Sequence, residues 1–168
     1  MSDRVVGGVD GQGRAVARKR ASTAAQRASL EWEAAALAAA GHPGVVDLLD
    51  VEPESLTTAY AGTHSLATGP PLTAERIMAL GAAVAATVAD LHSLGIVHGR
   101  VDPSHVVLGP DGRPLLCGFS GTTLAGRAGP PTSPTVHGFA DPRLRSGDPT
   151  PPAADVYAIG AVLRFLLL

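Results

Sequence analysis

The residues with the clearest chemical potential lie between positions 98 and 105, in the stretch HGRVDPSH. This stretch has the outline of a loop that transfers a phosphoryl group, a reaction that depends on charges placed around the moving group. Its charged residues, Arg100 and Asp102, lie in the wrong places for that reaction. The segment is therefore either a catalytic site of altered chemistry or the remainder of one.

A zinc site is the alternative reading of the histidines. His98, His105 and Cys117 are residue types that bind zinc, but their spacings match no usual zinc pattern. The sequence therefore predicts no metal ligands.

Composition limits the classes of partner and location. The chain has 168 residues, of which 45% are hydrophobic, enough for one core or for two small lobes that share a cleft. A net charge of -2 argues against a nucleic-acid partner. The single cysteine and an N-terminus without the apolar core of a signal peptide indicate a cytoplasmic protein. The apolar segment at 156–168 contains Arg164 and is too short to span a membrane, so we expect a core helix there.

Hydrophobic patterns predict an α+β fold. Asp10-Gly11 between two apolar runs is a hairpin signal. Ser22 or Thr23 can cap one helix, Thr73 opens a second, and Asp155 is expected to cap the last. The segment 120–152 is rich in Gly, Pro, Ser and Thr and is expected to be irregular. The expected strands are 5–9, 15–19, 45–51, 55–60, 106–108 and 114–117, and the expected helices are 23–40, 73–95 and a last one from about 155.

The order of these segments resembles the eukaryotic-like serine/threonine protein kinases. Six stretches are similar to motifs of that family, in the same order: AVARKR, LEWEAAALAAAGHPGVV, LHSLGIVHGRVDPSHVVL, LLCGFSG, GFADPR and AADVYAIGAVL. One such motif is weak evidence, but six in order at plausible spacing indicate common descent. The resemblance covers nearly the whole chain.

The resemblance gives each site residue an expected role. Lys19 matches the phosphate-pairing lysine and Glu33 matches its ion-pair partner, so both are candidates for nucleotide binding. His98, Phe119 and Asp155 match structural residues, and Asp155 is expected to hold the loop backbone at His98. The catalytic and metal-binding positions are degenerate: Arg100 replaces the catalytic aspartate, Asp102 the lysine, His105 the magnesium-binding asparagine, and Gly118 the aspartate of Asp-Phe-Gly.

These replacements imply that no catalytic residue is left. No group at the matching positions binds Mg²⁺ or receives the proton of an acceptor hydroxyl. Asp102 is also expected to repel the γ-phosphate of a nucleotide. We therefore expect no cofactor, with ATP bound without strong Mg²⁺ binding as the alternative.

The fold implied by the resemblance is a two-lobed, kinase-like α+β domain. Residues 1–60 are expected to form a small β-rich lobe with one helix, lacking the family's first strand and glycine-rich lid. Residues 61–168 are expected to form a truncated, mostly helical large lobe that ends in the helix starting near Asp155. Gly8, Gly11 and Gly13 could cradle a phosphate, but the short distance to Lys19 favours a plain hairpin.

The favoured function is that of a pseudokinase, a noncatalytic regulatory or protein-binding module. A protein partner is expected, with the apolar C-terminal helix as the candidate surface. Two alternatives stay open: a residual or atypical ATP-dependent kinase or other transferase, and a fragment of a larger kinase-like protein. The hydroxyls of Thr122, Thr123, Thr132, Ser133 and Thr135 are candidate phosphorylation sites, although a solvated linker is favoured for this segment.

Overall fold

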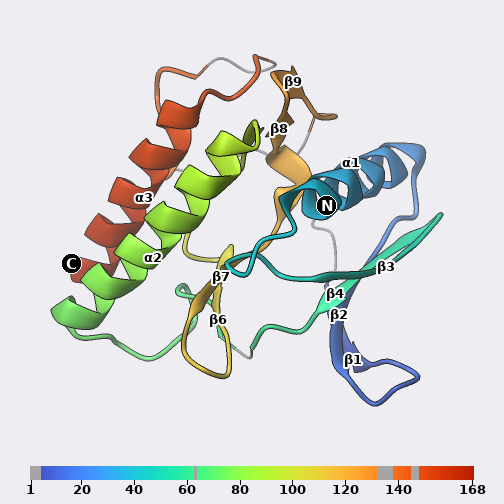
Figure 1. The fold of residues 1–168 in the computed structure, drawn as a ribbon, viewed down its shortest axis with the longest axis horizontal. Coiled ribbons are helices and arrows are strands. Elements are labelled where there is room, and N and C mark those ends of the chain that lie inside the picture. Colours follow the sequence, from blue (N-terminus) through green and yellow to red (C-terminus); the bar gives the residue numbers. More distant parts are fainter. Residues whose placement is uncertain (1–4, 63, 132–137, 145–147) are drawn as a thin grey trace.

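The computed structural model describes residues 5–62, 64–131, 138–144 and 148–168. Within these ranges the fold is α+β, with a β-rich region and three α-helices (Figure 1). It is compatible with a kinase-like domain, while the division into two lobes at residue 60 stays a prediction. The helices are α1 (Ala24–Ala40), α2 (Ala74–Ser93) and α3 (Pro152–Leu167).

The N-terminal half forms an antiparallel four-stranded sheet of order β1-β2-β4-β3. The stretch GGVDGQG is a hairpin, as favoured: Asp10 accepts hydrogen bonds from the backbone N–H groups of Gln12 and Arg14, and Gly13 has a φ of 78°. The strands are β1 (Val6–Val9), β2 (Ala15–Arg20), β3 (Leu48–Glu52) and β4 (Ser55–Ala59).

The strand expected at 45–51 was placed too early. Val45 and Val46 do not belong to the sheet, because Val45 forms a bridge with Leu116 and the N–H of Val46 donates to the carbonyl of Leu116. These two valines therefore connect the sheet to the hairpin β6 (Val106–Leu108) and β7 (Pro114–Leu116).

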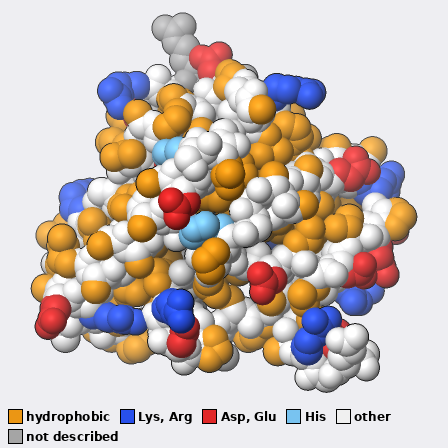
Figure 2. Space-filling model, viewed as in Figure 1, with side chains coloured by type: hydrophobic (Ala, Val, Ile, Leu, Met, Phe, Trp, Pro, Cys, Tyr) orange, Lys and Arg blue, Asp and Glu red, His pale blue; other side chains and the backbone are white. Residues whose placement is uncertain are grey.

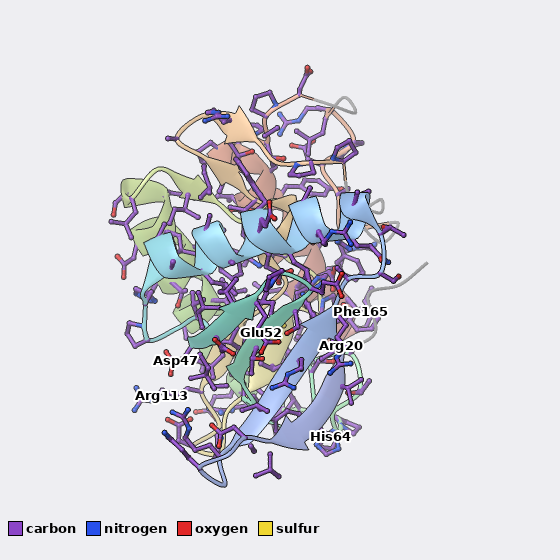
Figure 3. All side chains as sticks on the ribbon, turned by 90° about the vertical axis from the view of Figure 1, so that its right-hand side faces the viewer. Arg20, Asp47, Glu52, His64, Arg113 and Phe165 are labelled. Carbon is purple, nitrogen blue, oxygen red and sulfur yellow. The ribbon has the colours of Figure 1, made fainter. Side chains whose placement is uncertain are left out.

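Helix α1 has the caps that the sequence predicts. The Thr23 hydroxyl accepts from the N–H of Gln26, the Gln26 side chain accepts from the N–H of Thr23, and Gly41 ends the helix in the left-handed region. Figure 3 shows α1 running across the molecule above the sheet, which carries the labelled residues Arg20 on β2 and Glu52 on β3. The buried face of α1 places Glu33 next to the sheet.

Helices α2 and α3 pack side by side (Figure 1). Thr73 caps α2 as predicted, and Gly81 lets α3 approach closely, since a Cβ there would lie 2.5 Å from Leu163 Cδ2. The expected cap of α3 was wrong, because the helix begins at Pro152 with Pro151 as its N-cap. Pro152, the first residue of the helix, has a preset φ and no N–H that needs a capping acceptor. The carboxylate of Asp155 is therefore not used as the helix cap.

The segment expected to be irregular contains short elements. A 3₁₀ turn η1 (Phe119–Gly121) is followed by β8 (Thr123–Leu124) and β9 (Arg127–Ala128), and β8 pairs with β5 (Ile96–Val97). Thr132, Ser133 and Thr135 lie outside the described residues. Thr122 and Thr123 are buried, and Thr123 Oγ1 accepts from the N–H of Thr150, so neither hydroxyl is accessible for phosphorylation in this conformation.

The surface is mixed in charge. Figure 2 shows lysine, arginine and acidic side chains scattered mainly around the periphery of one face, among hydrophobic ones. This face carries no continuous basic stripe of the kind that follows a nucleic-acid backbone. None of the helices in the described ranges combines the length and the apolar composition that a bilayer crossing demands.

Candidate functional site

A cavity of about 520 Å³ lies where the sheet, α1, the loop at 98–105 and the β6–β7 hairpin meet. The site residues come to it from segments that are distant in the sequence: Lys19 from β2, Glu33 from α1, His105 from the loop and Gly118 from the end of β7. Its volume is in the range of small-molecule sites. The lining residues are Val5, Ala17, Lys19, Glu33, Val46, Thr58, Ala59, Tyr60, Ala61, Gly62, Arg100, Ser104, His105, Val107, Cys117, Gly118 and Ser120.

Lys19 and Glu33 form the expected ion pair. Lys19 Nζ lies 2.6 Å from Glu33 Oε1, and the Glu33 side chain is only 2% exposed. The same oxygen accepts the backbone N–H of Phe119 at 3.1 Å. The pair therefore ties β2, α1 and η1 together, and the positive charge of Lys19 is largely used by Glu33.

Asp102 does not face the cavity. Its carboxylate is buried and accepts from the N–H of Ser104 at 2.8 Å, from Ser104 Oγ at 2.5 Å and from His105 Nδ1 at 2.8 Å. Burial alone would raise the pKa of Asp102. The hydrogen bond and the charge of His105, together with the hydrogen bonds from Ser104, outweigh burial and lower this pKa to about 2. The loop thus turns this carboxylate inward, and its expected repulsion of a γ-phosphate stays a prediction.

The imidazole of His105 fills the space above Gly118. A Cβ built on Gly118 would lie 2.7 Å from His105 Nε2 and 3.2 Å from its Cγ, and Gly118 has a φ of 78°. Real Cβ atoms essentially never lie that close to another heavy atom, so an aspartate at 118 does not fit while His105 keeps this position. The two replaced positions are thus sterically matched to each other.

Arg100 is held by packing instead of by an acid. Its Cγ and Cδ cover Gly121, where a Cβ would lie 2.6 Å from each. Nη1 is 3.4 Å from Ser120 Oγ, and Nε is buried without a hydrogen-bond partner among the described residues. Arg100 therefore brings an unneutralised positive charge to the wall of the cavity.

Asp155 holds the loop backbone as the resemblance implies. Its carboxylate accepts from the N–H of His98 and from the N–H of Gly99, each at 2.8 Å, and lies 2.9 Å from His92 Nε2. His98 is fully buried edge-on against Phe119, with ring centroids 4.6 Å apart. Burial lowers the pKa of His98 to about 4, so this ring is neutral near pH 7. Its Nε2–H donates to the carbonyl of Cys117, and its Nδ1 accepts from the N–H of Arg100.

Ser104 and His92 are site residues that were not predicted from the sequence. Ser104 follows Asp102 by two residues and donates twice to it, the pattern of an Asx turn, so the stretch DPS carried a usable signal. His92 belongs to the matched motif LHSLG, but only the fold brings it to Asp155.

The candidate zinc ligands His98, His105 and Cys117 are not grouped as a metal site. Across the described ranges there is no group of three or more His, Cys, Asp or Glu side chains that could hold a metal ion. Burial raises the pKa of the Cys117 thiol to about 11, so this cavity residue is an uncharged thiol.

Comparisons with known proteins decide the family. A serine/threonine-protein kinase, PknK of Mycobacterium bovis, is 30% identical over 92% of this chain. The DNA damage-responsive serine/threonine-protein kinase RqkA of Deinococcus radiodurans is 30% identical over 78% of the chain, and the probable serine/threonine-protein kinase PkwA of Thermomonospora curvata over 68%. The chain belongs to the protein kinase superfamily. No family model matches it.

The match covers most of this chain but only a small part of each of these kinases. The chain spans 15% of the length of PknK, 22% of RqkA and 16% of PkwA. The comparison therefore concerns a kinase-like segment, and the activities of the whole relatives do not transfer with it.

Within this kinase-like segment, contacts that hold the fold together are present, whereas the side chains at the matched chemical positions differ. The Lys19–Glu33 pair and the bonds from Asp155 to the loop are present. At the positions matched to catalytic and magnesium-binding residues, the side chains are a guanidinium, an imidazole and none at all: Arg100, His105 and Gly118. Among the described lining residues the carboxylate is that of Glu33, whose Oε1 is bonded to Lys19 and to the N–H of Phe119.

Proposed function

We propose that this chain is a pseudokinase domain, which keeps the kinase cavity and acts by binding without transferring phosphate. The proposal includes a two-lobed arrangement, with the cavity at the junction of the lobes. The observation that carries it is the steric match of His105 and Gly118, since the imidazole takes the space that a metal-binding aspartate at 118 would need. Arg100, at the matched position of the catalytic aspartate, cannot accept a proton because its guanidinium stays charged.

The expected loss of reaction rate supports this proposal over a residual kinase. Removing one group that stabilises developing charge typically lowers the rate by about 10²–10³-fold. Four such positions differ here, Arg100, Asp102, His105 and Gly118, and groups that act as a unit leave only a small residual rate when the unit is lost. An activity near background is the expectation.

Phosphate transfer is the direct test. Purified protein with Mg²⁺ and radiolabelled ATP should label neither itself nor a generic protein substrate above the level of the Lys19→Ala variant, which lacks the lysine that could pair with a phosphate. Labelling that Lys19→Ala abolishes would contradict the proposal and favour the residual kinase.

We place the protein-binding surface on the outer face of α3. Val156 and Tyr157 are 64% and 41% exposed there. They flank an open groove of about 640 Å³, lined by Gly138, Arg143, Ala153, Val156, Tyr157, Gly160, Ala161 and Arg164. Arg164 is exposed and has no acidic partner among the described residues, whereas Arg143 is paired with Asp141. An amphipathic helix that carries a carboxylate toward Arg164 fits both the apolar groove and its charge.

Site-specific crosslinking tests this surface. A photoreactive phenylalanine analogue in place of Tyr157 should give one discrete protein adduct in cells, and the same analogue in place of Met78, an exposed residue of α2, should not. Arg164→Glu should remove the adduct at 157 by repelling the acidic partner. Equal adducts at both positions, or an adduct insensitive to Arg164→Glu, would count against the surface.

A further inference from the structure

Arg100 brings to the cavity a positive charge that has no acidic partner among the described residues. The ionisable side chains that line the cavity are Lys19, Glu33, Tyr60, Arg100, His105 and Cys117. Lys19 is paired with Glu33 at 2.6 Å, and His105 is bonded to Asp102 at 2.8 Å. In the described part of the chain, no Asp or Glu lies within ion-pair distance of Arg100.

A buried donor without a partner is costly and calls for an explanation. Nε of Arg100 is one of two buried side-chain atoms of the described residues that lack a hydrogen-bond partner, the other being Oε2 of Glu33. An anion in the cavity would be attracted by the charge of this guanidinium, for which the described residues supply no acidic partner. The hydroxyl of Ser120, 3.4 Å from Nη1, and Ser104 line the same wall and add further donors.

The cavity is polar at this wall and at the Lys19–Glu33 pair, and it has a large aliphatic share elsewhere. The aliphatic lining residues are Val5, Ala17, Val46, Ala59, Ala61 and Val107. A ligand that fits both parts combines an apolar or aromatic ring with an anionic group, and a volume of about 520 Å³ suits a molecule of nucleotide size.

Among the described residues, this cavity has no group of side chains that could hold a divalent metal. Hard cations bind several carboxylate and carbonyl oxygens at once. Glu33 is the carboxylate of the described lining; its Oε1 accepts from Lys19 and from the N–H of Phe119, which leaves Oε2 as its one oxygen without a partner. One such oxygen is too few for a hard cation, whereas a guanidinium can attract a polyphosphate without a metal.

We propose that Arg100 forms an anion site in this cavity that binds the phosphate groups of a nucleotide without a divalent metal. This inference rests on the proposed pseudokinase function, because it takes the replacement of the catalytic aspartate as the gain of a binding residue. Arginine suits the role since its planar fork of N–H donors matches phosphate oxygens.

Isothermal titration with ATP tests the site. ATP should bind in EDTA, and Mg²⁺ should not tighten the binding. The Arg100→Gln variant should raise the dissociation constant by roughly tenfold to a hundredfold, as expected for lost charged hydrogen bonds. Arg113→Gln is the matched control, since Arg113 is exposed at the periphery of the molecule (Figure 3) and should leave the affinity unchanged.

Two further ligands separate the parts of the nucleotide. Adenosine should bind wild type and Arg100→Gln equally, because it has no phosphate, while inorganic triphosphate should lose affinity in Arg100→Gln. Arg100→Lys keeps a charge and should restore part of the affinity, which shows that a loss in Arg100→Gln is not misfolding. Unfolding curves of each variant without ligand check this independently.

Three results would overturn the inference: no ATP binding in EDTA, binding only with Mg²⁺, or equal ATP affinity of wild type and Arg100→Gln. None of them is the result that overturns the pseudokinase proposal, which is phosphate transfer to protein. The two proposals can therefore fail separately.

Discussion

Replacing Asp155 by alanine should lower the free energy of unfolding by about 3–5 kcal/mol, since two buried N–H groups lose a charged acceptor. The N–H groups of His98 and Gly99 each donate to this carboxylate at 2.8 Å, and the Asp155 side chain is only 1% exposed. No other described residue accepts from them. Denaturant unfolding measures the difference, and ligand binding in the cavity should weaken with it because the loop at 98–105 loses its anchor.

The matched control is Asp47→Ala. Asp47 is exposed (Figure 3), and its side chain makes none of the hydrogen bonds found in the described residues, so the change should stay within about 0.5 kcal/mol. A loss for Asp155→Ala no larger than that of Asp47→Ala would show that the loop is held by packing of His98 and Phe119 alone.

Local signals predicted most of the fold. The capping residues Thr23 and Thr73 and the hairpin at Asp10-Gly11 act through hydrogen bonds within a few residues, so the sequence contains all that decides them. Val45 and Val46 could not be placed in the same way. Their side chains favour a strand, but whether they pair with the sheet or with Leu116 depends on a segment some 70 residues away along the chain.

The contacts of the site were predictable where they join one pair of oppositely charged residues. Lys19 and Glu33 carry opposite charges on adjacent elements, and the resemblance was enough to expect their contact. The direction of Asp102 was not predictable from its position, because it depends on Ser104 donating to one carboxylate oxygen and His105 to the other, which turns the group away from the cavity. The occupancy of the space above Gly118 also required the fold, since it depends on the rotamer of His105 in a different segment.

The match between His105 and Gly118 leads to the second large prediction. Gly118→Asp should destabilise the protein by about 2–4 kcal/mol, from overpacking of about 1–3 kcal/mol and from a non-glycine residue in the left-handed region. The overpacking part comes from the imidazole, since a Cβ at 118 would lie 2.7 Å from His105 Nε2. Thermal or denaturant unfolding measures the loss.

A double-mutant cycle isolates the steric part. In the His105→Ala background, Gly118→Asp should cost less by about 1–3 kcal/mol, because the ring that blocks the new side chain is gone. Gly126→Asp is the matched control: Gly126 has a φ of 77°, close to the 78° of Gly118, and a Cβ there meets nothing within 4 Å, so it reports the backbone cost alone. Additive effects of the two substitutions, or equal losses at 118 and 126, would mean that His105 moves aside freely. In that case the glycine at 118 would be no barrier to a metal-binding aspartate, and the replaced chemistry would rest on the missing charges alone.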